Sequence, residues 1–368
     1  MTMRNTSKIT TLENKFPLWA VEHGCIISKD ADITVAFEVE LPELYTVTNA
    51  EYEAIHGCWC KAVRVLPDFS VVHKQDWFVR ETYKPELQKE GMSFLSRSFE
   101  RHFNERPYLK HTCYLYLTKT TKERSRMQSN FSTLCRGNII PKELDRETAE
   151  KFMEATEQFA RIMNDSGFVR LRRLSTDEIT GTDGKAGVIE RYFSLMPEGN
   201  ATLQDIGLSA REMRIGDNYL CLHTLSDVED LPGKVATDTR YERLSTDRSD
   251  CRLSFASPVG LLLPCNHIYN QYVMIDNSDE NLQRFEKDAR NMQSLSRYSR
   301  SNSINREWID QYLNEAHSYG LTSVRAHFNV MAWSDDAEEL KRIKNDVGSQ
   351  LASMGCMPRH NTIDCPTL

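Results

Sequence analysis

The stretch 322–368 constrains the fold of this chain most strongly, because a strand pattern is followed directly by a helix pattern. Residues 322–333 (TSVRAHFNVMAW) alternate polar and apolar side chains and predict a β-strand with one buried face. Residues 334–355 predict a helix that Ser334 caps at its N-terminus. Its buried face consists of apolar residues at helical spacing: Leu340, Ile343, Val347, Leu351 and Met354. A chain with this pair must pack a helix against a sheet.

Strand and helix patterns alternate along the rest of the chain. Two short apolar runs flank a turn at 29–32 and predict a hairpin, and residues 147–165 predict an amphipathic helix. We therefore predict an α+β fold with helices packed on mixed or antiparallel sheets. The predicted divisions are a polar leader (1–20), a first α/β subdomain (21–210), a second α/β subdomain (211–355) and a linker (356–368) toward an absent C-terminal ATPase domain.

The two halves contain a similar order of elements. Residues 101–123 and 311–339 each run from the end of a helix through Asn-Glu to a strand and then a charged segment. A duplicated α/β unit would explain this order, and so would a chance likeness between helix–strand pairs.

Composition excludes several classes of protein. The net charge of -7 and the pI near 5.9 argue against a generally basic nucleic-acid surface. The most apolar run, at 259–264, is far too short to span a bilayer. The 10 cysteines are scattered without a CxxC pair, as in a cytosolic protein with reduced thiols.

The sequence contains neither a Walker A nor a Walker B motif. The string nearest to a phosphate loop, Gly181 to Ala186 (GTDGKA), has glycines too close together and alanine where a hydroxyl should hold magnesium. We interpret it as a turn between strands. The chain is thus expected to be non-catalytic and to bind no cofactor of its own.

Two alternatives remain open. The first is a stand-alone cytosolic enzyme with a Cys/His site, since thiols and imidazoles are plentiful. The second is a nucleic-acid-binding module that uses arginine clusters, one of them at Arg161, Arg170, Arg172 and Arg173. A further set of arginines alternates with acids and is interpreted as a solvated loop or a docking surface: Arg240, Arg243, Arg248 and Arg252.

Four long strings resemble the TraG-family ATPases of Bacteroides-type conjugative transposons, which are similar to the large motor ATPases of type IV secretion. They are LENKFPLWAVEHGCIISKDADITVAFEVELPELYT (12–46), RHFNERPYLKHTCYLYLT (101–118), TDTRYERLSTDRSDCRLSFASPVGLLLPCNHIYNQY (237–272) and LASMGCMPRHNTIDCP (351–366). The likeness extends from Leu12 over almost the whole chain, and polar positions share in it.

This resemblance implies that the chain is the N-terminal assembly and regulatory region of a motor for DNA transfer. ATP and Mg would belong to a missing C-terminal RecA-like domain. Expected partners are that domain, type IV secretion channel and inner-membrane components, and further copies in a hexamer. The expected location is the cytoplasmic face of the inner membrane, and direct DNA contact stays open. Arg359, His360 and Asn361 would form the interdomain junction.

Overall fold

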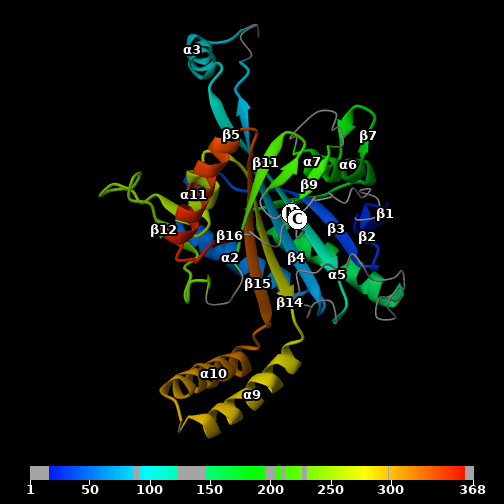
Figure 1. The fold of residues 1–368 in the computed structure, drawn as a ribbon, viewed down its shortest axis with the longest axis vertical. Coiled ribbons are helices and arrows are strands. Elements are labelled where there is room, and N and C mark those ends of the chain that lie inside the picture. The colour runs from blue at the N-terminus through cyan, green and yellow to red at the C-terminus, as the bar shows by residue number, and fades with distance from the viewer. Residues whose placement is uncertain are drawn as a thin grey trace, which may run out of the picture.

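The computed structural model describes residues 16–85, 91–122, 146–195, 204–208, 212–225, 230–296 and 298–360. Within these ranges a 12-stranded sheet forms the centre of the molecule, and helices cover both of its faces (Figure 1). Every strand pair described in this sheet is antiparallel. The predicted α+β fold is confirmed, while most of the predicted leader and linker lies outside the described residues.

The first half of the sheet is built from the N-terminal part of the chain. Its elements are β1 (Leu18–Glu22), β2 (Cys25–Ser28), β3 (Ile33–Glu40), the 3-10 helix η1 (Leu44–Thr46), α2 (Asn49–Arg64), β4 (Ser70–Thr82), α3 (Phe94–Phe103), β5 (Pro107–Lys119), α5 (Arg146–Asp165) and β6 (Arg170–Arg173). A connecting segment follows, with α6 (Thr176–Thr180), the two-stranded sheet of β7 (Gly181–Thr182) and β8 (Lys185–Ala186), and α7 (Val188–Ser194).

The second half has a similar succession of elements, with an additional strand pair and with two helices in place of α3. Its elements are β9 (Ile206–Leu208), β10 (Met213–Ile215), β11 (Asn218–Thr224), β12 (Asp238–Arg240), β13 (Arg252–Ser254), α8 (Ser257–Leu262), β14 (Asn266–Ile275), α9 (Ser278–Leu295), α10 (Arg300–Tyr319), β15 (Val324–Ser334), α11 (Ala337–Ser353) and β16 (Arg359–His360). The boundary predicted between residues 210 and 211 falls between β9 and β10, whereas these two strands pair with each other.

The strand order reveals two related units. The first unit places its strands in the order β6-β3-β5-β4, and the second in the order β16-β11-β15-β14. Both are the ferredoxin-like order of a βαββαβ unit, and a hairpin precedes each (β1–β2 and β9–β10). The units join where β4 pairs with β14, with Gln75 opposite Asn270. This arrangement agrees with the repeated element order in the sequence.

Two helix pairs cover one face of the sheet: α2 and α5 lie over the first unit, and α8 and α11 lie over the second. On the first unit, Phe152 and Phe159 of α5 are fully buried with Leu117 of β5. On the second, α8 and α11 bury Val259 and Val347 against β14 and β15. The opposite face is covered by α6 and α7 with a third core that includes two tryptophans of the central strands.

The predicted strand and helix near the C-terminus are confirmed as β15 and α11. All five residues of the predicted apolar face are buried. The predicted cap is wrong, since Asp336 caps the helix by accepting a hydrogen bond from the Glu338 amide (2.9 Å). Ser334 cannot take that place, because it is still part of β15 and pairs with Tyr219.

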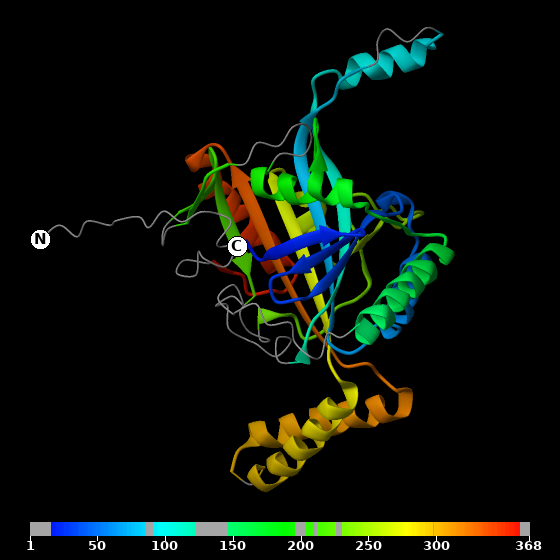
Figure 2. The same cartoon turned by 90° about the vertical axis from the view of Figure 1, so that its right-hand side faces the viewer.

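Each unit carries a helical appendage between the second and third strands of its βαββαβ order. The first, α3, lies between β4 and β5, and the second, the antiparallel pair α9–α10, lies between β14 and β15. Because β4 and β14 run antiparallel, the appendages leave the sheet at opposite ends (Figures 1 and 2). The molecule is therefore an elongated body with one helical projection at each pole.

Candidate functional site

The predicted docking arginines lie on an arm formed by residues 237–254. Arg240 forms an ion pair with Asp250 (3.2 Å) and Arg252 with Asp238 (3.4 Å), so both are partly neutralised inside the arm. The exposed side chains of Arg243 and Arg248 have no ion pair within the described residues. The structure therefore divides the four arginines into two that hold the arm together and two that face solvent.

The arm is attached to the first unit and to the predicted interdomain junction. Asn49 of α2 donates to Asp238 (3.2 Å), and Thr237 donates to Glu53 (2.6 Å). In the segment that precedes the arm, the Asp230 carbonyl accepts a hydrogen bond from the Met357 amide (2.9 Å). The chain before the arm thus lies beside the residues that lead into β16.

The junction residues themselves extend the sheet. Arg359 pairs with Thr224 and His360 with His223, which makes β16 the last strand of the second unit. Asn361 lies outside the described residues. The position of β16 on β11 matches that of β6 on β3, so the junction is an integral strand of the repeated fold.

Two of the four arginines proposed for nucleic acid, Arg170 and Arg172, are paired with acids of β3 and α6. Arg172 donates to Glu38 (3.1 Å) and to Glu178 (2.8 Å), and Arg170 lies 3.6 Å from Glu40. Hydrogen bonds to Glu38 raise the pKa of Arg172, and the Ser175 amide is the main cause that lowers the pKa of Glu178. Phosphate binding here would have to compete with these carboxylates.

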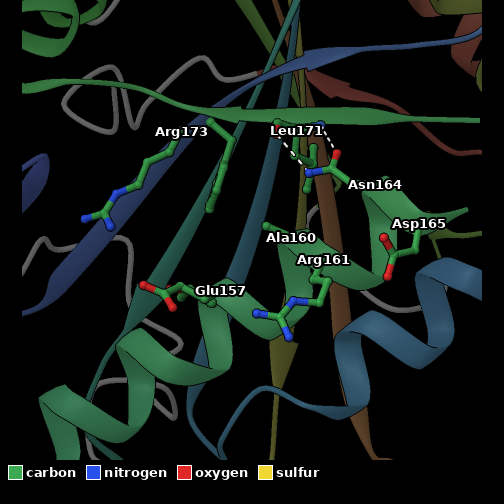
Figure 3. Close-up of a pocket in the computed structure, with 9 residues that line it drawn as sticks. Glu157, Ala160, Arg161, Asn164, Asp165, Leu171 and Arg173 are labelled. Carbon is green, nitrogen blue, oxygen red and sulfur yellow. Dashed lines mark hydrogen bonds between the residues drawn. The ribbon is translucent and has the colours of Figure 1, made fainter. Parts of the chain in front are cut away.

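A shallow pocket of about 430 Å³ lies between α5 and the strands β3 and β6. Figure 3 shows the charged ends of Glu157, Arg161 and Arg173 spread around its rim without converging on one point. The Asn164 side chain is occupied by the Leu171 main chain, at 2.7 and 3.2 Å. Opposite charges that do not converge give no defined ligand site, so this pocket supports no specific chemistry.

An ionic cluster centred on the buried Asp76 lies on β4 and β5, on the sheet face that the two helix pairs cover. Asp76 forms an ion pair with Lys74 and accepts a hydrogen bond from His111 (2.9 Å). Burial alone would raise the pKa of Asp76, but Lys74 and His111 hold it well below its usual range. Burial also raises the pKa of the Cys113 thiol in the same cluster.

The enzyme alternative requires a cysteine beside a histidine, and such a contact lies on α2, where the Cys60 Sγ is 3.6 Å from the His56 Nε2 and both residues are exposed. The cluster on β4 and β5 also contains a cysteine, Cys113. A nucleophilic cysteine needs a lowered pKa and access to substrate, whereas Cys113 is buried and its pKa is raised. Phe78 lies between His111 and His267, with ring centroids 4.5 and 4.6 Å away. The geometry favours a packing role at the join between the units.

The string nearest to a phosphate loop forms the predicted turn. Gly181 pairs with Ala186 and Thr182 with Lys185, and Asp183-Gly184 closes a two-residue hairpin. A phosphate loop requires a longer glycine-rich backbone that wraps the anion before a helix. The described residues likewise include no group of three or more His, Cys, Asp and Glu side chains arranged to hold a metal ion.

Sequence reasoning missed the most distinctive surfaces, which lie on the two appendages. Phe94 and Leu95 of α3 are 82% and 77% exposed, and Trp308 of α10 is 67% exposed. No residue of α3 is buried. A signal was present in residues 93–105, where three phenylalanines are separated by charged side chains.

Comparison with known proteins gives limited information. A family model described as a domain of unknown function from a B. theta gene description (DUF3875) matches residues 5–57. Within the described residues this match covers β1, β2, β3 and the first part of α2. None of the curated proteins compared matches the chain. In the part of the chain that the structure describes, no helix is long and apolar enough to cross a membrane.

Proposed function

We propose that this chain is a non-catalytic assembly module of a conjugation motor ATPase, and that it docks the motor to channel components. One observation carries the proposal: two helical appendages with exposed large apolar side chains project from opposite ends of one continuous sheet. A rigid body with separate contact surfaces would let one protein connect partners on two sides.

The pair α9–α10 is suited to a protein partner. Trp308 and Tyr298 are of the residue types that dominate binding energy at protein interfaces, and both are exposed. The hairpin is held together by Phe285 against Tyr312, with ring centroids 5.1 Å apart. Because this contact between the two helices orders the hairpin before binding, less conformational entropy is lost when Trp308 and Tyr298 meet a partner.

The base of this hairpin is fixed to the sheet by polar contacts. Arg325 of β15 forms two hydrogen bonds with Asp276, at 2.7 and 2.9 Å. The Ser323 amide donates to the Ser278 hydroxyl (3.0 Å), and the hydroxyls of Tyr312 and Ser323 lie 3.1 Å apart. These contacts couple the orientation of the α9–α10 hairpin to that of β15 in the sheet.

In this proposal, nucleotide chemistry belongs elsewhere in the motor. ATP and Mg would be held by a RecA-like domain that follows the junction at Arg359, His360 and Asn361. The whole assembly would be a hexamer peripheral to the cytoplasmic face of the inner membrane. The contact between Met357 and Asp230 supports a route from that domain to the arginine arm.

The proposal is tested by DNA transfer from donor cells that carry altered copies of the gene. Trp308→Ser with Tyr298→Ser should lower transfer frequency by about tenfold or more, as the loss of interface aromatics predicts. Tyr45→Ser is the matched control, because it removes an exposed aromatic residue from the body of the molecule. Undiminished transfer with the double variant, at equal protein level, would contradict the proposal.

A further inference from the structure

The helix α3 is held away from the body by an extension of the β4–β5 pair. Beyond Thr82 and Pro107, which are the last residues in register, the Tyr83 amide donates to the Arg106 carbonyl (3.0 Å). The Glu105 amide donates back to the Tyr83 carbonyl (3.2 Å). This two-stranded stalk places α3 at the pole of the molecule, as Figure 2 shows.

One side of α3 is apolar and open to solvent. Phe94, Leu95 and Phe99 are all exposed, and no residue of this helix is buried. Phe103 is the residue that fixes the helix, since its ring packs on Phe99 (4.5 Å between centroids) and on Tyr83 (6.2 Å). The stalk therefore presents the three outer side chains instead of covering them.

The other side of α3 is basic. Arg97 and Arg101 lie one turn apart, and neither guanidinium has an ion pair within the described residues. The one acid in the helix, Glu100, accepts a hydrogen bond from the Tyr83 hydroxyl (2.8 Å) and is thereby directed toward the stalk. The loop 83–106 contains five basic and four acidic residues (net +1), in a chain whose net charge is -7.

We infer that α3 lies in the interface of an anionic phospholipid membrane. Phenylalanine and leucine side chains would enter the boundary of the acyl chains, and the arginines would reach the lipid phosphates. With 10 residues, α3 is about 15 Å long and cannot span a hydrocarbon core of about 30 Å. The inference rests on the proposed function and names the surface that one of its poles contacts.

Charge complementarity supports an anionic membrane as the surface that α3 contacts. An acidic protein is repelled by an anionic surface, so a basic, apolar projection is the part that can approach it. The opposite pole differs, because α9 and α10 together carry seven acidic and five basic residues (net -2). With α3 on the lipid, this acidic pole points away from the membrane, toward water-soluble partners.

Flotation of the full chain with lipid vesicles tests the inference. Binding is expected to phosphatidylglycerol/phosphatidylethanolamine vesicles and to be much weaker to vesicles of phosphatidylcholine alone. Phe94→Ser with Leu95→Ser should lower binding about tenfold or more, and Arg97→Glu with Arg101→Glu should lower it and remove its dependence on salt. Trp19→Ser, which alters an exposed tryptophan on β1, should bind like the unaltered chain.

Equal binding of all variants, or binding that ignores lipid charge, would overturn the inference. Sedimentation velocity without lipid provides the second measurement. If the variant Phe94→Ser with Leu95→Ser dissociates an oligomer and still binds vesicles like the unaltered chain, α3 binds a second copy and the membrane assignment is wrong. In that case, a loss of DNA transfer in the Trp308 variant would still support the assembly module. The proposed function and the membrane contact of α3 can therefore fail separately.

Discussion

Gln75 and Asn270 face each other across the strand pair that joins the two units, and the Gln75 Nε2 donates to the Asn270 Oδ1 (3.1 Å). The same oxygen lies 2.9 Å from the His73 Nε2, and the Asn270 amide donates to Asn329 (2.9 Å). Trp77 donates its indole N–H to the Gln75 Oε1 (2.8 Å). A buried polar network thus fixes the register of the central strands.

Removal of the centre of this network should destabilise the fold. Asn270→Ala leaves three partners on two strands (β4 and β15) without this hydrogen-bond partner, so we expect the free energy of unfolding to fall by about 2–4 kcal/mol. Chemical denaturation measures it, with the exposed Asn345→Ala of α11 as a control that changes it by less than about 0.5 kcal/mol. A loss below about 1 kcal/mol for Asn270→Ala would mean that apolar packing alone sets this register.

The local patterns in the sequence predicted most elements, and the physical reason is their short range. Leu340 to Met354 repeat every three or four residues, and the repeat alone specifies both the helix and its buried side. The pairing of β4 with β14 joins residues nearly 200 positions apart, and no local pattern encodes it. The two-unit topology was therefore indicated by an echo in element order and established only by strand pairing.

The candidate site was predictable to a smaller extent. The spacing of apolar residues in α3 and in α5 is alike, yet Phe152 of α5 is buried and Phe94 of α3 is exposed. Whether a partner surface exists depends on the length of the β4–β5 stalk, which is a tertiary property. The charges of Arg240 and Arg252 were visible, but their pairing with Asp250 and Asp238 required the geometry of the arm.

Substitution of Trp333 should lower the free energy of unfolding strongly, whereas substitution of Trp308 should leave it almost unchanged. Trp333 is 2% exposed and packs edge-on against Trp77, 6.3 Å between centroids, so Trp333→Ala should cost about 3–5 kcal/mol of unfolding free energy. Trp308→Ser should change it by less than about 0.5 kcal/mol, because the side chain already contacts water. Thermal or chemical denaturation compares them, and a large loss at Trp308 would show that it packs internally.

The turn at Asp183-Gly184 should have no role in nucleotide chemistry. Purified chain is expected to show no ATP hydrolysis, and Lys185→Ala should leave nucleotide binding and stability unchanged, since Lys185 lies in a two-stranded hairpin. A coupled phosphate-release assay and a fluorescent nucleotide titration are the measurements. Hydrolysis that disappears with Lys185→Ala would refute the assignment of a non-catalytic module.

Buried histidines should make the fold sensitive to mild acid. Burial lowers the pKa of His267 to about 4, and also that of His73 to about 4, from an ordinary value of 6.5. Between these values the unfolded chain binds protons that the folded chain does not. The free energy of unfolding therefore falls as pH decreases through this window, by about 1.4 kcal/mol per pH unit for each histidine.

Denaturation midpoints measured from pH 7 down to about pH 5 test this dependence. The variant His267→Gln should flatten the slope by one histidine even if it lowers stability at neutral pH, because the slope counts protons and not contacts. The control His56→Gln alters an exposed histidine of α2 and should keep the original slope. Asp76 does not oppose the trend in this range, since its lowered pKa contributes stability that is lost only at more acidic pH. A slope that is identical in all three proteins would mean that His267 is protonated, and solvated, in the folded chain.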